Sequence, residues 1–158
     1  MPPIESNTSF GPVELGYYPV GSGSHWFTKW FRRQPPARGF KIHVSPNVGD
    51  AEIVARSVLP KLRSLGIPHK VVRNLQLYRQ LSTTHQGSKF ITIYTSGAPE
   101  AQRVLEEIEP ELRDLRRFGG LKPGTAPTTR ESKHREAETP IGDTGLVFTR
   151  WYAEGDAD

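Results

Sequence analysis

The feature that most constrains the fold is an alternation between segments with the two-residue period of a strand and segments with the period of a helix. Residues 40–44 (FKIHV) alternate apolar and polar side chains, which predicts a half-buried strand with Lys41 and His43 together on one face. Residues 51–65 then repeat apolar side chains every three or four positions, which predicts an amphipathic helix. The apolar stripe of this helix consists of Ala51, Val54, Ala55, Val58, Leu59, Leu62 and Leu65.

Both ends of this helix carry sequence signals. Asp50 belongs to the residue types that cap helix N-termini, and Gly66 followed by Pro68 is typical of a helix end. Pro60 lies inside the stripe and has no backbone N–H to donate, so the helix should be kinked or split there.

The same alternation continues along the chain. Residues 69–73, 89–95 and 145–152 are expected to be strands, and residues 74–81 a short helix. A second long helix is expected from Pro99, with the apolar stripe Ala101, Val104, Leu105, Ile108, Leu112 and Leu115. This order indicates a mixed α/β or α+β sandwich, of which we expect the α+β form: a small, twisted, mainly antiparallel sheet with two long helices packed on one face.

One domain is expected, over residues 39–152. Residues 1–38 are rich in glycine and proline breakers, so we expect a loosely ordered segment that could contact a peptide. Its aromatic residues have i, i+4 spacing and would form a short helix that either packs against the domain or binds a partner peptide; they are Trp26, Phe27, Trp30 and Phe31. Residues 119–143 lack apolar periodicity and should form a long loop, and residues 153–158 a solvated acidic tail.

The composition excludes several chemistries. No cysteine is present, which rules out a thiol nucleophile, a disulfide and thiolate-bound metal centres. The five histidines occur singly, without H-x-x-x-H or H-x-H spacing, and no phosphate-cradling glycine loop occurs, so we expect neither a metal nor another cofactor. No apolar run reaches the roughly 18–20 residues of a membrane span, and the start of the chain lacks the layout of a signal peptide. We therefore expect a soluble, cytoplasmic protein.

The placement of positive charge is more informative than its sum. The chain has 21 Lys and Arg against 17 Asp and Glu, a formal charge of +4 that is too small to identify a partner. The cations on or beside the expected strands are Lys41, His43, Lys70, Lys89 and Arg150. Charged residues are uncommon on strands unless they face water or a ligand, so this set is either a solvated face or a site for a dianion. Lys41 and His43 favour the second reading, because they share a face and interrupt an otherwise apolar strand.

In their order along the chain, these residues resemble the motifs of a known family. The family comprises the phosphothreonine lyases, which are type III effector enzymes, and the related lyase domains at the N-terminus of class III and class IV lanthipeptide synthetases. The matching blocks are FKIHVS (40–45), GIPHKV (66–71), SKFITIY (88–94) and FTRWY (148–152). They resemble, in turn, the family's K-x-H strand, its short strand with a second lysine, the G-K-F-I-T-[IV]-Y segment of the lanthipeptide branch, and the terminal strand with an arginine before an aromatic residue. Ser88 stands in place of the glycine of the third block.

The resemblance implies β-elimination of phosphate from phosphoserine or phosphothreonine in a peptide, which leaves dehydroalanine or dehydrobutyrine. It implies that Lys70 is the general base that removes the Cα proton, and that His43, as imidazolium, is the general acid that protonates the departing phosphate. Lys41 would stabilise the enolate-like charge on the substrate carbonyl. Lys89 and Arg150 would bind the phosphate dianion.

These residue types suit the chemistry on physical grounds as well. A Cα proton is very weakly acidic, so its removal needs a base whose pKa has been brought toward the operating pH, as happens to a lysine near other cations. Developing negative charge needs a fixed cation, and the leaving phosphate needs an acid such as histidine. Arginine binds a dianion in a bidentate way, whereas lysine acts as a point charge.

Two further residues carry less defined roles under the resemblance. Arg130, in PTTR at residues 127–130, would contact phosphate or substrate. Thr129 stands where the lanthipeptide branch has an aspartate, which weakens the case for a carboxylate that orients a cation. Tyr94 matches a strand-ending tyrosine of the family and is either a site residue or a core aromatic residue.

The expected function is therefore elimination of phosphate from a phosphorylated precursor peptide during lanthipeptide-type maturation, together with a separate Ser/Thr kinase and a cyclase. One alternative is an effector-type lyase that acts on a host phosphoprotein. The other is a non-catalytic module that binds a leader peptide or nucleic acid. The cations are spread along the chain rather than interleaved with aromatic residues on one surface, so we expect neither nucleic acid nor a membrane as a partner.

Overall fold

The computed structural model describes residues 9–19, 26–82, 87–127 and 137–153. Its strands are β1 (Tyr18–Pro19), β2 (Phe27–Trp30), β3 (Gly39–Val44), β4 (His69–Val72), β5 (Ile91–Tyr94), β6 (Thr139–Pro140) and β7 (Val147–Tyr152). Its helices are α1 (Ala51–Leu65), α2 (Leu75–Leu81) and α3 (Ala98–Phe118), with single 3-10 turns η1 (Val13–Leu15) and η2 (Val48–Asp50).

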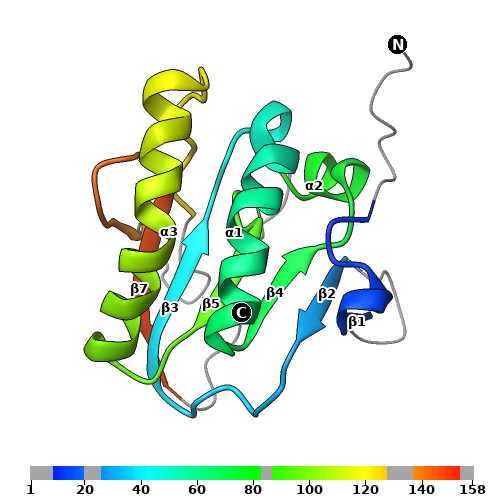
Figure 1. Ribbon diagram of the computed structural model, residues 1–158, viewed down its shortest axis with the longest axis vertical. Helices are drawn as coiled ribbons and strands as arrows, with labels where there is room; N and C mark the ends of the chain where they lie inside the picture. The colour runs from blue at the N-terminus through cyan, green and yellow to red at the C-terminus, as the bar shows by residue number, and fades with distance from the viewer. Residues whose placement is uncertain (1–8, 20–25, 83–86, 128–136, 154–158) are drawn as a thin grey trace.

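Within the described residues, the strands form one seven-stranded sheet of order β1-β2-β4-β5-β3-β7-β6. Every neighbouring pair is antiparallel. Helices α1 and α3 pack side by side on one face of this sheet (Figure 1). The α+β class, with two long helices on one face of an antiparallel sheet, is confirmed. No helix in the described part of the chain is long and apolar enough to cross a membrane.

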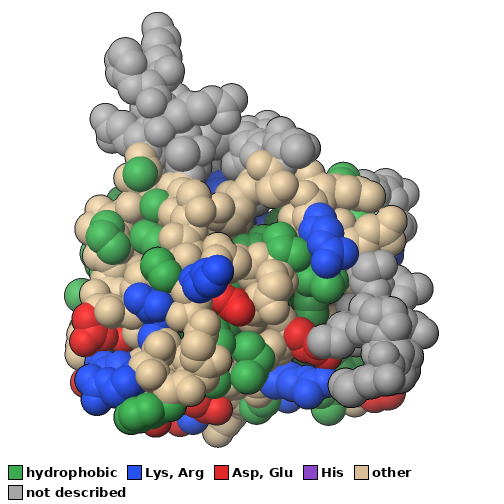
Figure 2. Space-filling view, turned by 90° about the horizontal axis from the view of Figure 1, so that it is seen from above, with side chains coloured by type: hydrophobic (Ala, Val, Ile, Leu, Met, Phe, Trp, Pro, Cys, Tyr) green, Lys and Arg blue, Asp and Glu red, His purple; other side chains and the backbone are tan. Residues whose placement is uncertain are grey.

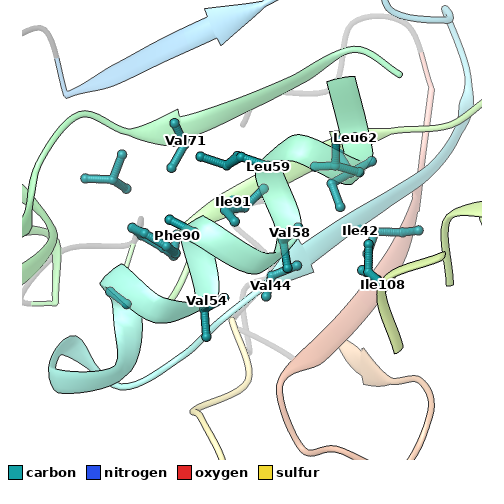
Figure 3. Close-up of a cluster of buried hydrophobic side chains, with 14 of the residues drawn as sticks. Ile42, Val44, Val54, Val58, Leu59, Leu62, Val71, Phe90, Ile91 and Ile108 are labelled. Carbon is teal, nitrogen blue, oxygen red and sulfur yellow. The ribbon is translucent and has the colours of Figure 1, made fainter. Parts of the chain in front are cut away.

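The core lies between these helices and the sheet (Figure 3). Strand β3 contributes Ile42 and Val44, which are completely buried. The other labelled side chains of the cluster are Val54, Val58, Leu59 and Leu62 from α1, Ile108 from α3, Val71 from β4, Phe90 just before β5 and Ile91 from β5. Burial of each such side chain stabilises the fold by about 1.5–3 kcal/mol, so this face is what holds the sheet in place.

Helix α1 differs from the expectation at its start and agrees with it at its end. It runs from Ala51 to Leu65 as one helix, so Pro60 does not split it. Gly66 ends it in the left-handed conformation, with φ at 71°, as expected. The prediction that Asp50 caps the helix is wrong: its side chain makes no cap hydrogen bond and instead accepts one from the backbone N–H of Lys122 at 3.2 Å. The reason is that η2 precedes the helix directly, so Asp50 already has helical backbone angles.

The aromatic segment near residue 27 is a strand, and the prediction of a short helix there is wrong. Strand β2 pairs antiparallel with β4, with Phe27 opposite Val72 and Trp30 opposite His69. Phe27 and Trp30 are buried on opposite faces of the sheet, so this part of the patch packs against the domain. The antiparallel pairing with β4 determines the strand conformation, and the i, i+4 spacing gives no information about that pairing. In the same way, the expected loop over residues 119–143 contains β6, which pairs with β7.

His69 is a buried residue of the helix-facing side of β4. Its Nδ1–H donates to the carbonyl of Ile67 at 2.7 Å, and its Nε2 accepts from the hydroxyl of Tyr17 at 2.8 Å. Its ring stacks on Trp30 with the centroids 5.4 Å apart. Burial lowers the pKa of His69 to about 4, with a smaller contribution from the positive charge of Arg63, while the bond to Ile67 opposes the shift.

This histidine predicts how stability depends on pH. Between about pH 6.5 and about pH 4 the unfolded chain binds a proton at His69 and the folded chain does not, so the free energy of unfolding should fall as the pH falls through this range. The loss should be about 3 kcal/mol at most, at about 1.4 kcal/mol per pH unit. Urea unfolding at pH 7.5 and pH 4.5 measures it. The variant His69→Gln should show a distinctly smaller difference between the two pH values, and equal differences would contradict the assignment.

Candidate active site

The sheet face that points away from α1 and α3 brings predicted site residues together in two rows. In the first row, His43 on β3 lies opposite Thr92 on β5, which lies opposite Lys70 on β4. Residues directly opposite one another in an antiparallel pair share a face and have Cβ atoms about 4.5–5.5 Å apart. His43 and Lys70 therefore lie on one face, on strands separated only by β5.

In the second row, Lys41 on β3 lies opposite Tyr94 on β5 and opposite Arg150 on β7. Lys41 precedes His43 by two residues, so this row lies beside the first on the same face. The register thus gathers four of the predicted cations, Lys41, His43, Lys70 and Arg150, on adjacent strands, and it places Tyr94 among them.

Several of these cations are withdrawn from solvent. Lys41 is 3% exposed, His43 is completely buried and Lys89 is 1% exposed. Lysine is almost never buried to this extent without a compensating partner. The solvated-face reading of these three residues is therefore wrong.

Two tyrosine rings flank Lys41. Its Nζ lies 5.0 Å from the centroid of Tyr152 and 5.6 Å from that of Tyr94. The hydroxyl of Tyr152 donates to the carbonyl of Pro36 at 2.7 Å, which fixes that ring. Aromatic faces attract an ammonium, so both rings interact favourably with the Lys41 cation.

Lys70 has a different environment. Its Nζ lies over the ring of Phe27 at 4.4 Å, and its cross-strand neighbour on β2 is Lys29. Like charges at directly opposed positions repel each other. The sequence analysis missed Lys29, because it interpreted the segment that contains β2 as a helix.

A buried ion pair joins His43 to Glu138. The Nδ1–H of His43 donates to Glu138 at 2.7 Å, and both side chains are completely buried. The other carboxylate oxygen lies 3.8 Å from Nε of Arg150. Glu138 is held by its own backbone N–H, which donates to the carbonyl of Pro127 at 2.8 Å. The negative charge therefore stabilises an imidazolium and a guanidinium at once.

The sequence analysis missed Glu138. It assigned this residue to the loop over residues 119–143, and no local pattern separates Glu138 from its charged neighbours. Thr129 stands where the resemblance would place a carboxylate that orients a cation. Glu138, 95 residues after His43 in the chain, provides a carboxylate for His43 instead.

The other predicted phosphate-binding residues lie outside the two rows. Lys89 is buried just before β5. The preceding Ser88 has a φ of 68°, a left-handed conformation in which glycine is comfortable and other residues are strained. The left-handed backbone conformation at this position therefore explains why the resembling motif has a glycine there. Arg130 and Thr129 lie outside the described residues.

The arrangement has what acid–base chemistry on an anion needs. One cation is flanked by aromatic rings, one amine faces a second lysine, and one histidine is oriented by a carboxylate. In the described part of the chain, no three metal-ligating side chains converge.

The fold is shared with solved structures of phosphothreonine lyases. One is the effector VirA of Chromobacterium violaceum, at a TM-score of 0.59 and 18% identity over 86% of this chain and 65% of that protein. Another is OspF of Shigella flexneri, at a TM-score of 0.60 and 18% identity over 86% of this chain and 70% of that protein. The Salmonella plasmid virulence C protein gives a TM-score of 0.58 at 15% identity, over 86% and 65%.

The chain thus spans about two thirds of the length of these proteins. At these identities the likeness shows a common fold, and it confirms the resemblance to the phosphothreonine lyases at that level. No curated protein sequence matches the chain.

A family model supplies the sequence-level assignment. The model that describes the N-terminal domain of RamC matches residues 15–117, well over half of the 158-residue chain. The matched range includes β2 to β5, with Lys41, His43, Lys70 and Lys89. The chain therefore belongs to the RamC N-terminal domain family.

Proposed function

We propose that this protein is a phosphoserine/phosphothreonine lyase that eliminates phosphate from a phosphorylated peptide. The observation that carries the proposal is the convergence of Lys41, His43 and Lys70 on one sheet face, with His43 held by the buried carboxylate of Glu138. The shared fold with phosphothreonine lyases supports it independently.

In the proposed reaction, the neutral amine of Lys70 takes the proton from the substrate Cα. The electron pair of that C–H bond forms the Cα=Cβ double bond, and the Cβ–O bond to the phosphate breaks. His43 donates the proton of its Nε2 to the leaving oxygen, while its Nδ1–H stays with Glu138. The products are phosphate and a dehydroalanine or dehydrobutyrine residue.

Fixed positive charges are proposed to stabilise both the negative charge that develops on the substrate carbonyl and the leaving phosphate. Lys41 is the proposed cation for the enolate-like charge on the substrate carbonyl, and its two tyrosine neighbours hold it by cation–π contacts. Arg150, Lys89 and Arg130 are the proposed phosphate ligands. Since β7 places Arg150 directly opposite Lys41, the phosphate and carbonyl positions lie side by side. No cofactor takes part in these steps.

The proposed substrate is a precursor peptide in lanthipeptide-type maturation, phosphorylated by a separate Ser/Thr kinase and passed to a cyclase. The likeness of residues 88–94 to the lanthipeptide branch and the match to the RamC N-terminal domain favour this setting. The fold likeness to effector proteins favours the alternative, a lyase that acts on a folded host phosphoprotein. On the one face shown in Figure 2, Lys and Arg side chains lie in separate groups, some of them beside acidic side chains, and do not form a continuous basic patch of the kind that binds nucleic acid.

Removing the base or the acid should stop the reaction. Lys70→Ala and His43→Ala should each lower the elimination rate by about 100-fold or more, since acid–base groups contribute at least that much. Mass spectrometry of a phosphoserine or phosphothreonine peptide reports the loss of phosphoric acid. Lys122→Ala, at an exposed lysine, is the control that should keep the full rate. Normal turnover by Lys70→Ala would refute its role as the base.

The choice of substrate has its own test. If the precursor-peptide assignment holds, a short phosphopeptide should react with the wild-type protein at least as fast as a folded phosphorylated kinase does. Elimination from the folded protein alone would favour the effector-type alternative.

The carboxylate of Glu138 should act on the pH profile and not only on the rate. Glu138→Gln keeps a hydrogen-bond acceptor but removes the negative charge that favours imidazolium, so the limb of the pH–rate profile that His43 controls should move to lower pH. Glu14→Gln, at an exposed carboxylate, is the matched control. A lowered rate with an unmoved limb would assign Glu138 a purely structural role.

Substitution of Lys41 should mainly lower the elimination rate, whereas substitution of Arg150 should also weaken phosphopeptide affinity. Lys41→Ala should lower the single-turnover rate by about 10²- to 10³-fold with a smaller effect on phosphopeptide affinity, as for loss of an oxyanion donor. Arg150→Ala should weaken affinity by about tenfold or more, because a charged hydrogen bond to phosphate is lost. Single-turnover kinetics and a binding titration measure the two effects, and the reverse pattern would exchange the two roles.

A further inference from the structure

A run of four aromatic rings crosses the sheet face that carries the site cations. This aromatic run consists of Tyr18, Phe31, Tyr94 and Tyr152. Successive ring centroids lie 6.4, 5.7 and 6.1 Å apart, and every contact is edge-to-face. Tyr18 lies on β1, the outermost strand, opposite Lys29 on β2. The run therefore leads from one edge of the sheet to the site.

The inner end of the run contacts a residue of the proposed active site. The Nζ of Lys41 lies 5.0 Å from the ring centroid of Tyr152 and 5.6 Å from that of Tyr94. Phe31 is the next ring, beyond Tyr94. In the proposed elimination the substrate carbonyl binds at Lys41, so the residues that flank the phosphorylated one must pass close to this run.

The outer end of the run is open to solvent. Tyr18 is 46% exposed, and Phe31 is partly exposed. Phe31 differs in this respect from Phe27 and Trp30, which are buried aromatic residues of the same segment. The steps of the proposed elimination use neither Tyr18 nor Phe31. Exposed apolar side chains that adjoin a functional site are typical of a contact surface, and aromatic rings supply much contact area there.

The charge beside the run narrows the chemistry of what it can bind. The Nζ of Lys29 lies 5.2 Å from the ring centroid of Phe31, so a substrate cation would meet a like charge there. An apolar side chain meets no such penalty and would bury the exposed parts of the rings.

We propose that Tyr18 and Phe31 bind a large apolar side chain of the phosphorylated peptide, within three residues of the phosphorylated one. Three extended residues cover about 10 Å, which is enough to reach from Lys41 past Tyr94 to Phe31. The inference rests on the proposed lyase function and adds a sequence preference to it.

A set of phosphothreonine peptides tests this preference on the full chain. Each peptide carries one phenylalanine at one of the three positions on either side of the phosphothreonine, in a background of alanine, and an all-alanine peptide is the reference. Mass spectrometry of phosphate loss gives kcat/KM for each peptide. At one of these positions the phenylalanine peptide should react about tenfold faster than the reference, because burial of a large apolar side chain contributes at least that much.

Matched variants show whether the aromatic run causes the preference. Tyr18→Ala and Phe31→Ala should each lower the ratio of the two kcat/KM values by about two- to tenfold, the contribution of one aromatic pair. Phe118→Ala is the control, because this ring is 78% exposed at the end of α3, on the other face of the sheet. Both rates are measured on the same variant, so a loss of folded protein lowers both and leaves the ratio unchanged.

Equal rates for all peptides would overturn the inference and leave the lyase function standing. A ratio that stays at the wild-type value in both Tyr18→Ala and Phe31→Ala would do the same. If no peptide of the set loses phosphate, the proposed function fails and the inference fails with it.

Discussion

The alternation of side chains along β3 is the constraint on which the rest of the structure depends. Ile42 and Val44 enter the core beneath α1 and α3, which forces Lys41 and His43 to the other face. A slip of one residue would place two cations in the core and two aliphatic side chains at the site. Pairing with six residues of β7 and four of β5 prevents that slip. The register that buries the apolar face therefore also determines the positions of the site residues.

The fixed geometry of the site also explains how the buried ion pair between His43 and Glu138 is tolerated. Removing His43 and Glu138 from water costs several kcal/mol for each ion, and their mutual attraction offsets this only when their geometry is good. The 2.7 Å contact and the nearby Arg150 provide that geometry. The ion pair is therefore poor evidence of stability in itself. Its value is that the hydrogen bond to Glu138 fixes the orientation of the His43 ring and keeps the proton on Nδ1.

Much of this fold could be predicted from the sequence, because its signals are local. The periodicity of residues 40–44, of the two long helices and of the last strand follows from which face of each element is buried. The same periodicity predicted that Lys41 shares a face with His43. The resemblance to a known family added Lys70, and the sheet register then placed it in the row of His43.

What could not be predicted depends on partners that are distant in the chain. The aromatic spacing before residue 31 fits a helix equally well until β4 is known to lie beside it. Glu138 has no local signal, because its role depends on a contact with His43, which is distant in the sequence. The prediction of a cap at Asp50 was wrong for another reason. The 3-10 turn η2 precedes the helix directly, so backbone carbonyls of that turn already accept from N–H groups that a cap would satisfy.

The order of the strands also bears on how the chain is made. The hydroxyl of Thr149 donates to the carbonyl of Lys41 across 108 residues, so β3 has no partner on that side until β7 has been synthesised. At usual translation rates this interval is on the order of ten seconds. An apolar strand with an open edge is a template for pairing with other chains. The strand that carries Arg150 to the site is thus also the one that closes this edge of β3.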